Sequence, residues 1–221
     1  MSATCVATVA AMMSPAPTAE AKTDLGRPRV MWQQCVERAL QCFPTGGGYH
    51  TGRNIPPGFR QTAWTGLDRA VRVTATGVCV DPYLATPSFC SSATYLLLLK
   101  SLELYEKTCG VMPPRKEWEY LKPYTVDHRP YPIQNDGVGA WGRANANGPG
   151  MAELAHELKI GTNLYIGTTG EYANLADRNE MFASIRRYDF MKIFWNDEIG
   201  KDERGHMVVV LGRSSHSNRS R

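Results

Sequence analysis

The sequence predicts a single α+β domain in which one central helix is followed, late in the chain, by adjoining antiparallel strands. Three segments support this class: TPSFCSSATYLLLLKSLELYEK at 86–107, DFMKIFW at 189–195 and HMVVVLG at 206–212. The first has an apolar surface too broad for an exposed helix, the second alternates as a strand does, and the third is a β-branched run. The chain has 221 residues, 43% of them apolar, which suits one well-packed domain.

The N-terminal part is expected to differ from the rest. Residues 1–26 are predicted to form a flexible leader or a signal-like segment, and residues 27–221 the single domain. Ala19-Glu20-Ala21 resembles a cleavage site, but the segment lacks the basic start and the strong apolar core of an export signal. No apolar run approaches the roughly 20 residues that span a bilayer, so we expect no membrane insertion.

Two further elements precede the central helix. RVMWQQCVERALQCF at 29–43 has apolar residues at helical spacing and predicts a packing helix. Residues 64–80 alternate valines with polar neighbours and predict a short strand or turn. For the central helix, Thr86 or Ser88 is the expected cap, Pro87 suits a first helical position, and the helix is expected to end before Cys109.

Composition argues against several classes of function. The chain has 25 basic and 21 acidic residues, and a net charge of +4 spread evenly makes a nucleic-acid partner a poor prediction. Six cysteines without a C-x-x-C pair give no reason to expect a metal site, while a disulfide involving Cys79 or Cys109 is left open. Gly137 to Gly142 fits G-x-G-x-x-G, but no buried strand precedes it, so no cofactor is expected.

Cys90 and His206 are the candidate catalytic residues. Cys90 lies where the central helix begins, and the positive end of the helix dipole favours a thiolate there. His206 opens a predicted strand, and a histidine held by a rigid strand can serve as the base. A cysteine at a helix start with a histidine at a strand start is the papain-type arrangement. The alternative is a buried, inert thiol and a structural histidine at a strand edge.

A long irregular segment, NDGVGAWGRANANGPG at 135–150, is the candidate substrate-binding region. Trp141 offers an aromatic platform, and Arg143 and Asn145 offer hydrogen-bonding groups for a polar, peptide-like or sugar-like ligand. A structural loop with a buried tryptophan explains the same residues equally well.

Three short motifs together resemble the NlpC-like cell-wall peptidases: Phe89-Cys90-Ser91-Ser92, the strand from Asp189 to Trp195, and Gly205-His206 before an apolar strand. In that superfamily a D-C-S-type motif opens the helix, a G-D-type strand follows, and G-H begins the next strand. Phe89 and Tyr188 depart from this pattern. The wider chain is similar to the peptidoglycan amidase effectors of type VI secretion, in particular their third family.

The resemblance implies a papain-like fold, with Cys90 at the N-terminus of a central helix that packs on an antiparallel sheet carrying His206. It implies hydrolysis of peptidoglycan stem peptides or crosslinks in the periplasm of a rival bacterium after type VI secretion, and a cognate immunity protein. The bond cut is left open; family placement favours that between diaminopimelate and D-alanine. It also implies a polar third residue, Asn218, with His216 as its competitor. A resident wall-remodelling peptidase would carry the same motifs, and a wall-binding module without turnover is a further alternative.

Overall fold

The computed structural model describes residues 6–11, 27–45, 67–75, 77–85, 89–110, 115–123, 133–134, 137–138, 140, 151, 162–166, 183, 185–196 and 205–212. These residues form helices and antiparallel strands, which confirms the predicted α+β class. The elements before the central helix are β1 (Val6–Ala11), α1 (Arg27–Gln41), α2 (Leu67–Ala70), β2 (Val71–Thr74), β3 (Gly77–Val80) and a 3-10 turn (Pro82–Leu84). The central helix and those after it are α3 (Cys90–Cys109), α4 (Arg115–Leu121), β4 (Ile133–Gln134), β5 (Gly137–Val138), β6 (Thr162–Ile166), β7 (Phe190–Phe194) and β8 (Gly205–Val209).

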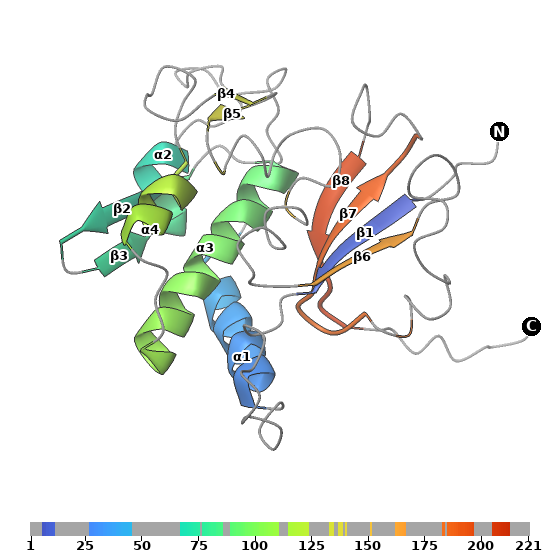
Figure 1. The fold of residues 1–221 in the computed structure, drawn as a ribbon, viewed down its shortest axis with the longest axis horizontal. Helices are drawn as coiled ribbons and strands as arrows, with labels where there is room; N and C mark the ends of the chain where they lie inside the picture. The colour runs from blue at the N-terminus through green and yellow to red at the C-terminus, as the bar shows by residue number, and fades with distance from the viewer. Residues whose placement is uncertain are drawn as a thin grey trace, which may run out of the picture.

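The larger sheet has the strand order β6-β1-β7-β8, with each neighbouring pair antiparallel. The predicted strands at 189–195 and 206–212 are its neighbours β7 and β8, in which Phe190 pairs with Val209 and Ile193 with His206. The helix α3 packs against β8 (Figure 1). The N-terminal ends of β8 and α3 therefore carry the two candidate catalytic residues on elements that are in contact.

The N-terminal segment differs from the predicted flexible leader. Val6–Ala11 forms β1, which lies between β6 and β7 and pairs with both. Three of its six residues are β-branched, and such residues suit a pleated strand once tertiary partners are available. The prediction of a flexible leader over residues 1–26 is therefore wrong for Val6–Ala11, and the signal-like alternative stays a prediction.

The helix α3 is the centre of the hydrophobic core, as its apolar run predicts. Its fully buried residues include four consecutive leucines, and the core around them draws on α1, β3, α4, β7 and β8; the α3 members are Tyr95, Leu96, Leu97, Leu98, Leu99 and Leu102. The helix ends at Cys109, and Gly110 caps it in the left-handed region with φ of 66°. Glycine adopts this conformation without the steric cost that a Cβ brings.

The start of α3 lies later than the sequence suggests. The helix begins at Cys90 and its N-cap is Phe89, so the expected caps Thr86 and Ser88 and the first-turn position of Pro87 are wrong. The capping group lies inside the helix instead. The Ser92 hydroxyl accepts the Phe89 N–H at 3.0 Å and donates to the Phe89 carbonyl oxygen at 3.0 Å.

A buried carboxylate ties α3 to the β2–β3 hairpin. Glu103 is only 1% exposed, and its Oε2 accepts the Val80 N–H at 3.0 Å. The Lys100 ammonium lies 2.8 Å from the same oxygen and also donates to the Val80 carbonyl oxygen at 2.8 Å. Lys107 pairs with the other Glu103 oxygen. Both polar groups of the Val80 backbone are thus satisfied by α3.

The remaining described helices pack on α3. The predicted helix at 29–43 is α1, and its Trp32 ring meets Tyr105 of α3 edge-on with centroids 6.1 Å apart. On α4, the Trp118 Nε1–H donates to Glu106 at 3.1 Å. The Tyr95 hydroxyl donates to the carbonyl oxygen of Leu121. Burial raises the pKa of Tyr95 well above its ordinary value, so this hydroxyl stays protonated as a donor.

Short hairpins account for two other predicted segments. The valine-rich stretch within 64–80 forms the antiparallel pair β2–β3. Gly137–Val138 forms β5, which pairs antiparallel with β4, so the start of the G-x-G-x-x-G spacing belongs to a hairpin. In the described part of the chain, no helix combines the length and apolar character that crossing a membrane requires.

Candidate active site

Cys90 is held at the first position of a well-anchored helix. The Phe89 backbone before it is extended, with φ of −143° and ψ of −179°, and Ser92 fixes its N–H and carbonyl groups. The Thr94 hydroxyl donates to the Cys90 carbonyl oxygen at 2.9 Å. The Cys90 side chain is half-buried and packs against the core. Hydrogen bonds from Ser92 and Thr94 therefore fix the Phe89 backbone and the Cys90 carbonyl group, although the N-cap residue Phe89 has no capping side chain of its own.

The location of Cys90 suits a nucleophile. The first-turn N–H groups of a helix point away from its carbonyl ladder, toward the N-terminal end, where the helix dipole is positive. The backbone N–H of Cys90 is one of these groups. A developing oxyanion near the thiol would meet both the N–H and the positive dipole end.

His206 occupies the second position of β8, opposite Ile193 of β7. Gly205 before it fits only as glycine, because a Cβ at this position would collide with the backbone carbonyl oxygen of Ile193. The residue before the candidate base is therefore fixed by close approach of two backbones. This gives a physical reason for the glycine in the Gly205-His206 motif.

Trp195 is a residue of this site that the sequence did not single out. It follows β7 directly and is 61% exposed, whereas its neighbour Phe194 is buried. The indole stacks on the His206 ring with an interplanar angle of 17° and centroids 6.3 Å apart, within the range of offset aromatic pairs. In sequence, Trp195 reads as the last apolar residue of a strand, so its exposure carries no signal there.

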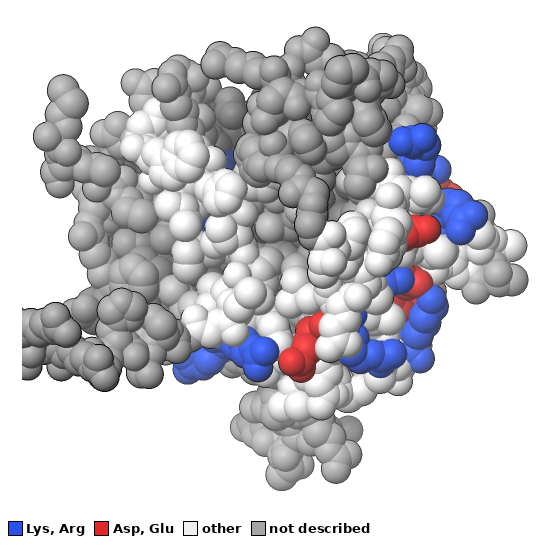
Figure 2. Space-filling model, turned by 180° about the vertical axis from the view of Figure 1, so that it is seen from behind, with Lys and Arg blue, Asp and Glu red and all other residues white. Residues whose placement is uncertain are grey.

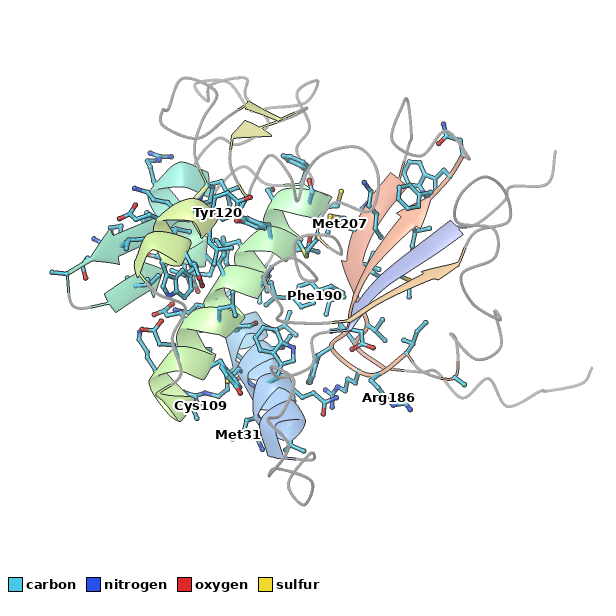
Figure 3. All side chains as sticks on the ribbon, viewed as in Figure 1. Met31, Cys109, Tyr120, Arg186, Phe190 and Met207 are labelled. Carbon is cyan, nitrogen blue, oxygen red and sulfur yellow. The ribbon has the colours of Figure 1, made fainter. Side chains whose placement is uncertain are left out.

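Cys90 and His206 lie on elements that pack together, but the His206 side chain does not lie on the face of β8 that packs against α3. Side chains alternate between the faces of a strand. Met207 and Phe190 belong to the core shared with α3 and reach toward that helix from the sheet (Figure 3). His206 therefore leaves β8 on the face opposite Met207, the face on which it meets Trp195. The structure therefore brings α3 and β8 together but places the His206 ring on the face of β8 opposite the core against which Cys90 packs.

The turn before β7 explains one departure from the NlpC-like pattern. Tyr188 has φ of 72°, a left-handed conformation that glycine adopts most easily. The buried Asp189 carboxylate accepts the Arg186 N–H at 2.7 Å and closes the turn. The Val210 N–H donates to the Asp189 carbonyl oxygen at 2.9 Å, which extends the pairing of β7 with β8. Asp189 is thus a structural residue of the turn.

The described thiols are not joined by disulfides. This holds for Cys35, Cys42, Cys79, Cys90 and Cys109, so the alternative of a disulfide involving Cys79 or Cys109 is not found among them. Burial, and then the neighbouring Cys109, raise the pKa of Cys35, which makes it a poor nucleophile. The described residues hold no cluster of three or more His, Cys, Asp or Glu side chains suited to a metal ion.

The other predicted site residues lie outside the described residues. These are the third catalytic candidates Asn218 and His216 and the substrate-binding candidates Trp141, Arg143 and Asn145. Their roles stay predictions.

Charged side chains on the described surface are mixed in sign. From behind the view of Figure 1, Lys and Arg lie next to Asp and Glu along one side of the molecule (Figure 2).

Comparison of the chain with protein-family models, with curated proteins and with solved structures gave no match.

Proposed function

We propose that this protein is a cysteine amidase of papain-like, NlpC-like architecture that hydrolyses peptide bonds of peptidoglycan, with the diaminopimelate–D-alanine crosslink as the favoured target. The observation that supports this most is the packing of α3, which begins at Cys90, against β8, which opens with Gly205-His206. The core cluster includes Met207, the residue after His206, and the partly buried Cys90 packs against that cluster. Nucleophile and base thus come from two elements with a common core.

In the proposed mechanism, the Cys90 thiol gives its proton to His206 and the thiolate attacks the amide carbonyl carbon. The oxyanion accepts the Cys90 N–H at the helix start. His206 then returns the proton to the leaving amine, which departs and leaves a thioester on Cys90. Water hydrolyses the thioester with His206 again as base. Because His206 leaves β8 on the face opposite Met207, the proposed first transfer requires the imidazole to move toward the start of α3 until it is within hydrogen-bond reach of the thiol.

Asn218 is proposed as the residue that orients the imidazole by accepting its second N–H, with His216 as the competing assignment. The biological setting is proposed from the resemblance: secretion by a type VI system, action on stem peptides in the periplasm of a rival cell, and a cognate immunity protein in the producer.

The test is digestion of purified Gram-negative peptidoglycan, with released fragments resolved by chromatography and mass spectrometry. Wild-type protein should convert crosslinked dimers to monomers, and Cys90→Ala should leave them intact while the protein stays folded. Cys109→Ala is the matched control, because it removes a half-buried thiol from the other end of the same helix. Dimer loss with Cys90→Ala would disprove the proposal.

A wall-binding module without turnover is the second candidate, favoured by the exposed indole of Trp195. Alkylation of the protein with iodoacetamide distinguishes the two. A module would bind sacculi equally well before and after alkylation and release no fragments, whereas alkylation of Cys90 should abolish fragment release by an amidase.

A further inference from the structure

Trp195 is unusual among the tryptophans that the structure describes. Trp32 and Trp118 are buried in the core, whereas Trp195 is 61% exposed at the end of β7. Large aromatic side chains supply most of their stabilisation through burial, so an indole in this position gains little for the fold. Its exposed surface is available to a ligand.

The orientation of this indole is restrained. One side stacks on the His206 ring, and the backbone before it is set by the buried Phe194 and the β7–β8 pairing. Ile193, directly opposite His206, is half-buried and lies on the same face of the sheet. An oriented, exposed aromatic ring beside an aliphatic side chain is a common composition for a binding surface.

The position of Trp195 indicates which part of a substrate it would meet. In the proposed reaction, His206 delivers a proton to the leaving amine, so the amine side of the scissile bond lies against the imidazole. A ring stacked on His206 then borders that same side. In the favoured crosslink the leaving amine belongs to a diamino acid, which has a chain of methylene groups and becomes an ammonium ion when released. An indole packs against such methylene groups in the substrate, and it attracts the ammonium ion only after the amide bond has been cut.

We infer that Trp195 is a substrate-binding residue that contacts the amine-side diamino acid of the scissile bond and selects for it. This inference rests on the proposed amidase function and adds the element that recognises the leaving group. Because Trp195 is exposed, its replacement should leave the fold intact.

The test compares wild type, Trp195→Ala and Trp195→Phe on two substrates with the same acyl part. The first has D-alanine joined to the side-chain amine of a diamino acid, and the second is the D-alanyl methylamide. For Trp195→Ala we expect KM for the first substrate to rise about five- to tenfold more than KM for the methylamide, because only the first substrate loses a packing contact between the indole and methylene groups. Trp195→Phe should lie between the two, because it keeps an aromatic face.

A second measurement separates this inference from the proposed function. Titrating the Cys90→Ala variant with the diamino-acid substrate, followed by intrinsic tryptophan fluorescence, measures binding without turnover. If wild type does not cleave the substrate but the Trp195→Ala substitution weakens its binding, the amidase function would be overturned and the Trp195 contact would stand. Equal kinetic losses on both substrates would overturn the inference, because Trp195 would then act through His206. Unchanged kinetics on both substrates, or no binding at all, would also overturn it.

Discussion

Replacing Gly205 by alanine is the sharpest test of how the fold positions the candidate base. An added Cβ would collide with the Ile193 carbonyl oxygen and would also lie 3.4 Å from the Ile193 carbonyl carbon and 3.5 Å from the Phe194 Cα. All three are backbone atoms, so no side-chain rotation relieves the overlap. The start of β8 must therefore move away from β7.

The expected loss of stability follows from that movement. Forcing extra volume into a packed site costs about 1–3 kcal/mol, and weakening one terminal hydrogen bond of the β7–β8 ladder adds about 1 kcal/mol. We expect the free energy of unfolding of Gly205→Ala to fall by about 2–4 kcal/mol and Tm by roughly 4–16 °C for a chain of this size. Because His206 is the next residue, a shift of about 1 Å should lower turnover by about a hundredfold.

Urea denaturation and peptidoglycan digestion measure these two effects. Gly212→Ala is the matched control, since a Cβ there would have no heavy atom within 4 Å, and it should behave as wild type in both assays. Wild-type stability in Gly205→Ala would refute the close approach of the two backbones. A destabilised variant with full turnover would refute the role of β8 in placing the base.

Two further predictions concern α3. Removing the buried partner of Lys100 by Glu103→Ala should cost about 3–5 kcal/mol in urea denaturation, whereas Lys107→Ala, whose side chain is 59% exposed, should cost less than about 1 kcal/mol; equal costs would contradict the buried pair. Burial raises the pKa of Glu106, and the hydrogen bond from Trp118 opposes this shift only in part. The folded state therefore binds this proton more tightly than the unfolded state, so the stabilisation is present below the ordinary glutamate pKa and is lost as pH rises through the raised one. Glu106→Gln keeps an acceptor for Trp118 and should flatten the unfolding free energy between those pH values; an unchanged slope would contradict the shift.

The sequence predicted the elements whose signal is local. The four-leucine run of α3, the alternation of β7 and the β-branched residues of β8 are all found where the pattern predicts them. It missed what depends on distant partners. Val6–Ala11 consists mostly of small residues and becomes a strand because β6 and β7 pair with it on both sides.

The buried polar groups at α3 show the same limit. Glu103 lies in the segment SLELYEK, and nothing in this local sequence indicates that Val80 and Lys100 satisfy its carboxylate in the core. The helix start was misplaced because Thr86, Pro87 and Ser88 are conventional start signals. Ser92 replaces them from within the first turn.

The same distinction between local sequence signals and contacts with distant residues applies to the candidate site. Cys90 and His206 were predicted because each begins an element with a strong local signal, and the structure shows those elements in contact. Trp195 was missed because exposure at the end of a strand is a property of the folded surface. The sequence also could not predict on which face of β8 the His206 side chain lies, because this depends on the register with β7.

Tyr188 occupies an unusual backbone position immediately before β7. The G-D pattern has glycine where this chain has a tyrosine at φ of 72°, a conformation that costs a non-glycine residue roughly 1 kcal/mol or more. The side chain offsets that cost by burial, being 4% exposed, and the Arg187 guanidinium lies 4.6 Å from its ring centroid. Burial and a hydrogen bond with Glu37 of α1 raise the pKa of Tyr188, so its hydroxyl stays protonated. The turn into β7 is therefore held by burial of Tyr188 and by its hydrogen bond with α1.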